Sequence, residues 1–285
     1  MTARVLEGRP VVEHLAAAVR ERADRLVSEG AIRPRLAVVE FSDEGPGAVY
    51  ASRLATSAAG AGIDPLRILA SPGIGLGELA AIVEPLNRDP SIAGIVLVQP
   101  VPPPIDREAA VMLVDPTKDV DGAHPLTAGR LVRGASTFVP ATALAVMAVL
   151  RHYRIPVAGR VAVVIGRSPV VGRPVAGLLL EADATVVVCH TRTEDLAAET
   201  RRAEILVTAA GAPGLVRREM VARGAVVVDA GYTTTASGPR GDVALEEVRD
   251  LVSAITPVPG GVGRVAPMMV VEQTVRAAEA ALSPG

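Results

Sequence analysis

The sequence predicts an α/β protein of two domains with parallel sheets, and three observations predict it. The chain has 285 residues, enough for two domains with sizeable cores. Short continuous runs of β-branched and other apolar residues recur along it, as expected for strands buried on both faces of a parallel sheet. Helical segments separate these runs, and this alternation indicates βαβ units.

The elements of the first domain follow from the spacing of apolar residues. The pattern predicts, in order, a helix at 10–27, a strand at 35–42, a helix that includes "AVYASRLATS" at 48–57, a strand at 66–70, a helix at 76–89 and a strand at 93–99. We expect this domain to cover residues 1–140, with the C-terminal helix at 267–285 packing back on it.

The second domain is expected to cover residues 141–266. Its predicted elements are a helix at 144–153 and strands at 160–166, 184–190, 204–210 and 224–231, and the last apolar helix follows at 267–282. No internal repeat, low-complexity tract or long linker interrupts the chain.

Composition excludes several classes of protein. Apolar residues make up 49%, charged residues 21%, and the net charge is −2, as in an ordinary soluble globular protein. No basic stretch suggests nucleic acid, no apolar run reaches about 18 residues, and "MTARVLEGRP" has no signal-like apolar region. The single cysteine, Cys189, allows no internal disulfide. We therefore expect a cytoplasmic protein without nucleic-acid or membrane partners, and we assign no metal site.

The segment 161–180, "VAVVIGRSPVVGRPVAGLLL", is a candidate phosphate site. A strand ends at Gly166, and a helix is predicted to begin near Val170, so backbone N–H groups at its start could bind an anion. Gly166 and Gly172 would allow close approach, although Ser168 holds the second glycine position of the common G-x-G-x-x-G pattern. A tight strand-to-helix turn without a ligand is the alternative interpretation.

The tip of the next strand indicates which dinucleotide this site would bind. A carboxylate there selects NAD through the ribose hydroxyls, whereas cationic groups accommodate a 2′-phosphate. The tip holds His190, Thr191 and Arg192, and Arg173 is near in sequence. This pattern favours NADP.

Three further stretches carry side chains or backbone suited to chemistry. "IVLVQPVPPPID" at 95–106 ends a strand in a glutamine and a rigid proline run; "DPTKDVDGAHP" at 115–125 contains Asp119, Asp121 and the only lysine, Lys118; "AITPVPGGVGRVAPMM" at 254–269 has adjacent glycines. Each also has a structural interpretation, namely a strand end, capping and Asx turns, and a wide turn.

Taken together, three motifs resemble the FolD family of bifunctional methylenetetrahydrofolate dehydrogenases and methenyltetrahydrofolate cyclohydrolases. "KDVDGAHPLTAGRL" (118–131), "GRSPVVGRP" (166–174) and "TPVPGGVG" (256–263) occur in the family's order, and the similarity covers essentially the whole chain. The resemblance implies an N-terminal catalytic domain, a Rossmann-like NADP domain, a folate cleft between them, a role in one-carbon metabolism and a homodimer.

The resemblance also assigns site residues. The dinucleotide loop is represented by Gly166, Arg167, Ser168, Val171, Gly172, Arg173 and Pro174, with Thr191 and Arg192 at the adenosine phosphate and Tyr232, after Asp229 and Gly231, near the nicotinamide. On the substrate side the implied residues are Tyr50, Val98, Gln99, Asp121, Pro259, Gly260 and Gly261, of which Tyr50, Gln99 and Asp121 would be catalytic. A carboxylate such as Asp121 suits an amino-pyrimidinone edge, because it accepts two hydrogen bonds.

The substrate side departs from the family pattern. The family's helix has Tyr-x-x-x-Lys, and here Leu54 stands at the lysine position, while Arg53 points about 100° away. Gly47 replaces a serine, and the changes extend to "VQPVPPP", "PATA" (140–143) and "GRVA" (263–266). Because 28 of the 29 basic residues are arginines, drift explains a lysine-to-arginine change but not leucine.

These departures leave several functions open. We expect an NADP-dependent methylenetetrahydrofolate dehydrogenase with poor or absent cyclohydrolase activity, because leucine cannot transfer the proton that lysine handles. The alternatives are an NADP-dependent oxidoreductase with a non-folate substrate, a non-catalytic NADP-binding protein, and a bifunctional enzyme with a substitute for the lysine.

Overall fold

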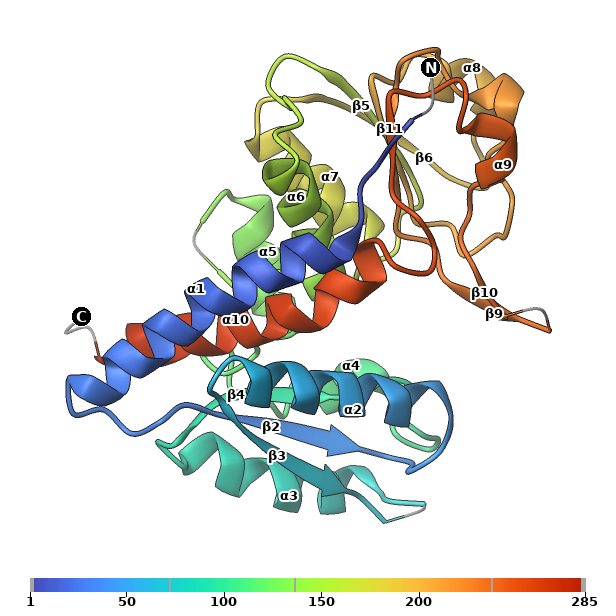
Figure 1. Cartoon of the computed structure of the whole chain (residues 1–285). Coiled ribbons are helices and arrows are strands. Elements are labelled where there is room, and N and C mark those ends of the chain that lie inside the picture. Colours follow the sequence, from blue (N-terminus) through green and yellow to red (C-terminus); the bar gives the residue numbers. More distant parts are fainter. Residues whose placement is uncertain (1–2, 72, 136, 237, 283–285) are drawn as a thin grey trace. The chain divides into compact units, whose positions relative to one another are not determined.

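The computed structural model describes residues 3–71, 73–135, 137–236 and 238–282, and the chain divides into two compact units (Figure 1). Unit 1 comprises residues 1–12 and 142–266, and unit 2 comprises residues 13–141 and 267–285. Each unit contains a parallel sheet with helices packed on it, so the predicted α/β class is confirmed.

Unit 1 is built on a six-stranded parallel sheet with the order β1–β11–β8–β7–β5–β6. Its strands are β1 (Arg4–Val5), β5 (Val161–Ile165), β6 (Thr185–Cys189), β7 (Ile205–Thr208), β8 (Val226–Asp229) and β11 (Ala254–Ile255). The other elements are α6 (Ala141–His152), α7 (Gly172–Glu181), α8 (Leu196–Thr200), the 3-10 helix η1 (Arg218–Met220), the hairpin β9 (Thr233–Thr235) and β10 (Gly238–Arg240), and α9 (Leu245–Val248). The four strands predicted between residues 160 and 231 are all present.

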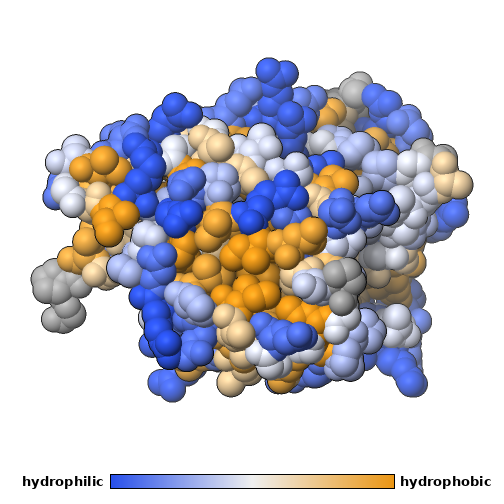
Figure 2. Space-filling model, turned by 90° about the horizontal axis from the view of Figure 1, so that it is seen from below, coloured by the Kyte–Doolittle hydropathy of each residue, from blue (hydrophilic) through white to orange (hydrophobic). Residues whose placement is uncertain are grey.

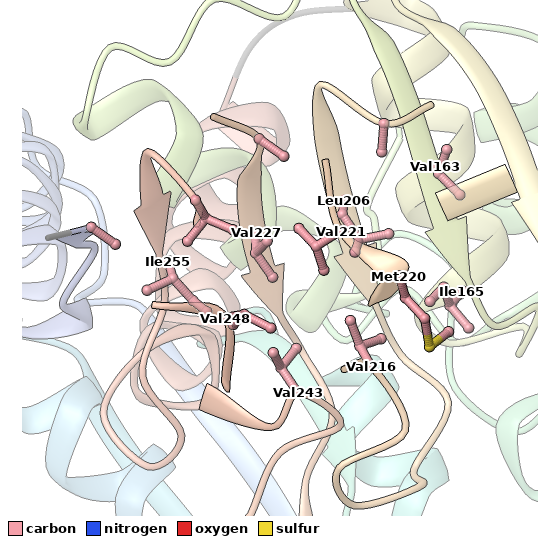
Figure 3. Packing of buried hydrophobic residues seen from close by; sticks show 14 of the residues in the cluster. Val163, Ile165, Leu206, Val216, Met220, Val221, Val227, Val243, Val248 and Ile255 are labelled. Atoms are coloured by element: carbon pink, nitrogen blue, oxygen red, sulfur yellow. The ribbon is translucent and has the colours of Figure 1, made fainter. Parts of the chain in front are cut away.

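The core of unit 1 lies on the β-branched strands of this sheet. Figure 3 shows Val163, Leu206 and Val227 of three neighbouring strands, with Val216 and Met220 from the loop and 3-10 helix that cover them. Val163, Leu206 and Val227 have no exposed surface, which explains why these segments are almost purely apolar in sequence.

Unit 2 has a three-stranded parallel sheet with the order β3–β2–β4. The strands are β2 (Arg35–Glu40), β3 (Asp64–Leu69) and β4 (Ile92–Leu97), and the helices are α2 (Gly45–Gly60), α3 (Leu76–Arg88), α4 (Arg107–Val111) and α5 (Pro125–Val132). A buried cluster including Val39, Leu79 and Ile95 joins α3 to the sheet.

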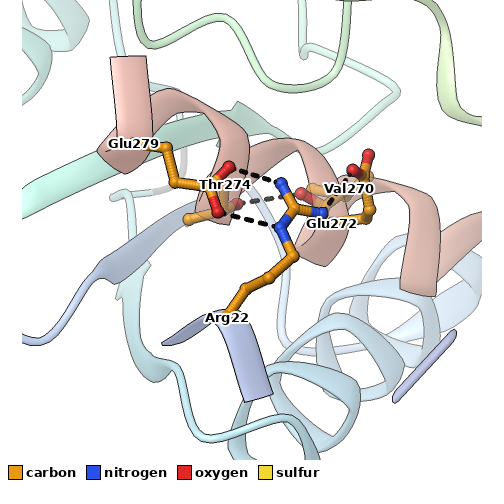
Figure 4. A network of polar contacts seen from close by, with 5 residues as sticks. All are labelled: Arg22, Val270, Glu272, Thr274 and Glu279. Carbon is orange, nitrogen blue, oxygen red and sulfur yellow. Dashed lines mark hydrogen bonds and ion pairs between the residues drawn. The ribbon is translucent and has the colours of Figure 1, made fainter. Parts of the chain in front are cut away.

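Two long helices, α1 (Gly8–Ser28) and α10 (Val262–Leu282), contain residues of both units. Within unit 2 they are tied by Arg22 of α1, which donates hydrogen bonds of 2.9 and 2.6 Å to Glu279 and one of 2.9 Å to Glu272 (Figure 4). The two carboxylates raise the pKa of Arg22.

The structure differs from the sequence prediction at both long helices. Residues 1–140 were expected in the first domain, but β1 pairs in parallel with β11 of unit 1. A strand of two residues is too short to give a recognisable pattern in the sequence. Helix α10 begins at Val262, five residues before Pro267, which lies inside it. The N–H that proline lacks would have paired with the carbonyl of Gly263, and Gly263 is exposed, so water can satisfy that carbonyl.

Apolar side chains gather in one area of the surface, bordered by hydrophilic residues, in the view of Figure 2. In unit 2, the exposed large apolar residues include Leu69 on the edge strand β3 and Leu76 at the start of α3. Within the described ranges, no helix is both long enough and apolar enough to cross a membrane.

Candidate functional site

The strand order of unit 1 places the predicted phosphate loop where a parallel sheet binds ligands. From β5 the chain crosses to β6 on one side and then returns to β7 on the other side. The crevice outside the carboxyl ends of β5 and β7 is therefore the topological switch point of this sheet. Gly166 directly follows β5 and lies at this point.

Two glycines at this point meet the predicted need for close backbone approach. Gly166 has a φ of +120°, and a Cβ there would lie 2.3 Å from the carbonyl oxygen of Ala209, which follows β7. A Cβ on Gly172, the first residue of α7, would lie 2.1 Å from the carbonyl oxygen of Gly166. Helix α7 therefore starts in direct contact with the strand end, as a dinucleotide loop requires.

Ser168 organises the first turn of α7. Its hydroxyl accepts hydrogen bonds from the backbone N–H groups of Val171 at 3.1 Å and Gly172 at 3.4 Å, and its carbonyl accepts one from Arg173 at 3.1 Å. The serine at the second glycine position thus closes the turn that leads into α7.

The tip of β6 at residues 190–192 and the start of α7 present cations and no carboxylate, and the first acidic residue after the tip is Glu194. Arg167, Arg173 and Arg192 are exposed, and Arg173 Nε donates to the carbonyl of Arg167 at 3.1 Å. His190 holds the tip, because its Nδ1 accepts from the backbone N–H of Arg192 at 3.1 Å. Asp195 is used elsewhere, as the cap of α8. This donor set fits the 2′-phosphate of NADP better than the free ribose hydroxyls of NAD.

Two buried aspartates, which the sequence analysis did not single out as site residues, fix the loops at this edge. Asp242, with no exposed surface, accepts hydrogen bonds from the N–H groups of Ala210 and Ala212 at 2.6 and 2.7 Å. Asp229 accepts from the Thr208 hydroxyl at 2.9 Å and from the N–H of Val243 at 3.0 Å. The sequence carried a signal for them, because each aspartate has a glycine close to it in the chain: Gly231 follows Asp229 by two residues, and Gly241 directly precedes Asp242.

The glycines beside these aspartates have no room for a side chain. A Cβ on Gly231 would lie 2.3 Å from the Asp242 carboxyl carbon, and one on Gly241 would lie 2.1 Å from Asp229 Oδ2. Tyr232, the next residue, is 55% exposed at the same edge of the sheet. The position of this predicted nicotinamide neighbour is therefore set by the buried carboxylates.

The loop after β11 contains Pro259, Gly260 and Gly261, which were predicted to contact substrate. A Cβ on Gly261 would lie 2.6 Å from the carbonyl oxygen of Pro257, so the bend of the loop itself requires this glycine. Gly260 has a φ of +115°, and its carbonyl accepts a hydrogen bond from the N–H of Gly8 at 2.8 Å. The wide-turn interpretation accounts for both glycines, and Pro259 is exposed beside them.

In unit 2, the strand order places Gln99 at a second switch point. The chain passes from the central strand β2 to β3 and then to β4 on the other side, so the carboxyl ends of β2 and β4 flank the crevice. Gln99 follows β4 and is exposed, whereas Val98 is only 3% exposed and its N–H donates to Val39 at 2.9 Å. A Cβ on Gly47 would lie 3.4 Å from the Gln99 carbonyl oxygen, so the start of α2 rests against this strand end.

Helix α2 carries Leu54 on its buried face. Ala51, Leu54 and Ala58 form the buried stripe of the helix, and Leu54 has no exposed surface. At 100° per residue, Leu54 lies about 40° from Tyr50 around the helix axis, and Arg53 is exposed on another side. No titratable side chain therefore occupies the position one turn after Tyr50.

The loop at 115–125 uses most of its polar groups structurally. Lys118 Nζ donates to the carbonyls of Leu86 and Asp89 at 3.0 and 2.7 Å at the end of α3, and Asp115 accepts from Thr117. Asp119 accepts hydrogen bonds from the N–H groups of Ala123 and His124 and from the Thr127 hydroxyl. The capping interpretation therefore holds for these residues.

Asp121 is the exception in this loop, because its carboxylate accepts no hydrogen bond from any described residue. Burial raises the pKa of Asp121 to about 7, and the Asp119 charge adds to the rise while Arg107 opposes it. Burial also raises the pKa of Tyr50 well above its usual range, with a further contribution from the Asp121 charge. The charge of Asp121 therefore acts on Tyr50, and the half-buried Asp121 carboxylate has no hydrogen-bond donor among the described residues, so it is open to water or to a ligand.

The predicted residues therefore form two groups, each at the carboxyl edge of one sheet. Gly166, Arg167, Ser168, Arg173, Thr191, Arg192 and Tyr232 lie at the edge of the larger sheet with the loop of Pro259, Gly260 and Gly261, and Tyr50, Gln99 and Asp121 belong to unit 2. The fold and the edge of the larger sheet define a dinucleotide-binding α/β protein.

Comparison with known proteins gives the family. Residues 6–121 match the model of the tetrahydrofolate dehydrogenase/cyclohydrolase catalytic domain, and residues 140–282 match the model of the NAD(P)-binding domain of the same family. The chain belongs to the tetrahydrofolate dehydrogenase/cyclohydrolase family, as the FolD-like motifs predicted.

Individual relatives cover the chain from end to end. The bifunctional protein FolD of Acidiphilium cryptum is 44% identical over 283 residues, which are 98% of this chain and 99% of the relative. The crystal structure of the bifunctional FolD methylenetetrahydrofolate dehydrogenase/cyclohydrolase of Campylobacter jejuni is 39% identical with a TM-score of 0.95, covering 98% of this chain and 100% of that one. The Trypanosoma brucei FolD complexed with NADP cofactor and inhibitor is 34% identical with a TM-score of 0.93, covering 100% of both chains.

Proposed function

We propose that this protein is an NADP-dependent 5,10-methylenetetrahydrofolate dehydrogenase whose cyclohydrolase activity is weak or lost. The observation that carries the proposal is a contrast between the two sites. The carboxyl edge of the larger sheet keeps the glycine loop and the arginines expected to bind a dinucleotide. Helix α2, in contrast, has the fully buried Leu54 one turn after Tyr50, where the family has a lysine. Dehydrogenation needs positioning of two reactants, but hydrolysis needs a group that moves a proton.

The cofactor half is assigned to residues 141–266. Arg173 and Arg192 bind the 2′-phosphate, the loop from Gly166 to Ser168 faces the pyrophosphate at the start of α7, and Tyr232 lies by the nicotinamide. When bound, the nicotinamide accepts the hydride from the one-carbon bridge of the substrate. The Trypanosoma brucei relative, which was solved with NADP, supports this cofactor.

The substrate half is assigned to unit 2, residues 13–141 and 267–285. Asp121 binds the amino-pyrimidinone edge of the pterin, which offers the hydrogen-bond donors that its carboxylate lacks. Tyr50 packs against the folate, Gln99 lies at the one-carbon unit, and Val98 contacts the substrate beside it. The open acceptor positions of Asp121 suit a substrate edge that carries N–H donors, as the pterin does.

The cyclohydrolase step lacks its proton carrier. A positioned acid or base contributes about 10²–10⁴-fold to such a reaction, and leucine contributes none of this. Arg53, exposed on another side of α2, does not replace it. Gln99 alone can orient a water molecule but cannot exchange a proton at neutral pH.

Separate titrations of NADP and methylenetetrahydrofolate, followed by an assay of NADPH formation, test the proposal. Binding of both ligands with turnover supports it. Binding of NADP alone indicates an oxidoreductase with another substrate, and binding of both ligands without turnover indicates a non-catalytic protein.

We further propose that the protein is a cytoplasmic homodimer. The FolD resemblance supports the dimer, and the buried lone Cys189 suits a reducing compartment. Light scattering after size-exclusion chromatography tests the dimer, because a mass near 29.2 kDa at micromolar concentration would contradict it.

A further inference from the structure

The backbone on both sides of Asp121 is held by a single side chain from a distant helix. Gln273 of α10 has no exposed surface. Its Nε2 donates to the carbonyl of Val120 at 2.7 Å and to the carbonyl of Val139 at 2.9 Å, and its Oε1 accepts from the N–H of Val139 at 2.8 Å. One amide thereby joins the segment before Asp121 to a segment that comes about twenty residues later.

The residue after Asp121 rests on the same second segment. Gly122 has a φ of +65°, and a Cβ there would lie 2.4 Å from the Val139 carbonyl carbon and 2.5 Å from the Pro140 nitrogen. Asp121 therefore lies between two residues that this contact holds. Gln273 binds the carbonyl of Val120, and Gly122 packs on Val139, whose N–H and carbonyl both bind Gln273.

Glutamine is suited to this position by its chemistry. The site offers one N–H donor and two carbonyl acceptors, and a primary amide supplies one acceptor and two donors. A carboxylate cannot donate to the two carbonyls, and an apolar side chain would leave three buried backbone groups without partners.

Helix α10 is itself fixed where it carries Gln273. Its neighbour Glu272 pairs with Arg22 of α1 at 2.9 Å, and the hydroxyl of its other neighbour, Thr274, donates to the carbonyl of Val270 at 2.9 Å (Figure 4). The amide therefore projects from an anchored element.

We propose that Gln273 is a positioning residue for substrate binding, which acts by fixing the direction of the Asp121 carboxylate. The inference rests on the proposed role of Asp121 toward folate, and it extends the substrate site to a residue of the C-terminal helix that does not itself touch the substrate.

The test compares Gln273→Asn and Gln273→Met with the matched control Thr274→Val. Thr274 is also fully buried, but its hydroxyl bonds only within its own helix. We expect the KM for methylenetetrahydrofolate to rise at least about tenfold in Gln273→Met and less in Gln273→Asn, because the shorter amide keeps part of the network. The NADP dissociation constant and the control should stay within about twofold of wild type.

A double-mutant cycle with Asp121→Asn separates positioning from general destabilisation. If Gln273 acts through Asp121, its substitution should raise the KM little further when Asp121 is already changed. An equal rise in both backgrounds, or an unchanged KM in Gln273→Met, would overturn the proposal.

A measurement without substrate keeps this proposal distinct from the proposed function. The ¹³C carboxyl shift of Asp121 reports its titration midpoint in the ligand-free protein. We expect Gln273→Asn to move that midpoint by at least about half a pH unit and Thr274→Val to leave it in place. A titration midpoint of Asp121 that does not move in Gln273→Asn contradicts the positioning role, whether or not the protein binds folate. A midpoint that moves in a protein that binds no folate would support the positioning role and refute only the proposed folate substrate.

Discussion

The substitution Leu54→Lys is the sharpest perturbation of this protein, because it restores the family's catalytic side chain in a buried position. Leu54 shares the buried face of α2 with Ala51, and Gly47 on the same face rests against the Gln99 end of β4. A lysine there would start on the side of the helix that faces the candidate substrate site, one turn from Tyr50.

The cost to stability follows from the burial of Leu54. Its side chain has no exposed surface, and full burial of a leucine contributes about 1.5–3 kcal/mol. The lysine stem keeps part of that contribution, whereas an amine without partners costs about 1–3 kcal/mol more. The sum, about 2–5 kcal/mol, stays below the 5–15 kcal/mol stability that is common for domains, so we expect a destabilised but folded variant.

The expected gain is at least about tenfold in hydrolysis of methenyltetrahydrofolate, the low end of acid–base catalysis, because the residues that follow Gln99 in "VQPVPPP" differ from the family pattern. The assay is the spectroscopic decay of the methenyl compound, corrected for its spontaneous hydrolysis. Leu54→Met, which keeps volume but adds no titratable group, and Arg53→Lys, on the exposed side, serve as controls and should give no gain.

A folded Leu54→Lys variant that binds folate and still shows no acceleration would refute this reasoning. It would mean that the other substitutions on the substrate side have rebuilt the pocket. A variant that does not fold would support the interpretation of Leu54 as a core residue only.

Four other predictions concern the remaining residues of the two sites. Arg173→Ala and Arg192→Ala should each weaken NADP binding by about 1.5–3 kcal/mol and leave NAD binding unchanged, as measured by titration of both cofactors; equal use of the two by wild type would contradict this. Asp121→Ala should abolish folate turnover without changing NADP binding. The pKa of Asp121 is raised to about 7, so the folded state binds this proton more tightly than the unfolded state does. The contribution of Asp121 to the free energy of unfolding is therefore complete below about pH 4 and is lost as the pH rises to 7. In Asp121→Asn, the free energy of unfolding measured by chemical denaturation should depend less on pH over that range. Asp242→Ala, which removes the hydrogen bonds to the N–H groups of Ala210, Gly211 and Ala212, should lower the free energy of unfolding by about 3 kcal/mol and weaken NADP binding, and an unchanged midpoint would argue against its role in the loops.

Much of the fold could be predicted from the sequence because each local signal agreed with its tertiary role. The strands of unit 1 are apolar runs because both faces of their sheet are covered, and the strand end at Gly166 was marked by the glycine that its contact with Ala209 requires. The short β1 could not be predicted, because its pairing with β11 depends on residues about 250 positions away.

The substrate site was predictable only in part. Its loop signalled polar chemistry, but the sequence could not show that Asp119 and Lys118 are consumed by capping while Asp121 stays without a partner. The burial of Leu54 was likewise open, since an apolar residue beside a tyrosine suits either a core or an altered site. Gln273 was invisible, because its partners lie more than 130 residues earlier.

The most direct test of the central claim is a single reaction of wild-type protein with methylenetetrahydrofolate and NADP, in which NADPH and the methenyl product are followed together. A dehydrogenase with little cyclohydrolase activity should form one methenyl molecule for each NADPH, and that product should decay at the rate measured without enzyme. Formation of NADPH without accumulation of the methenyl compound, with decay that grows in proportion to enzyme concentration, would contradict the claim.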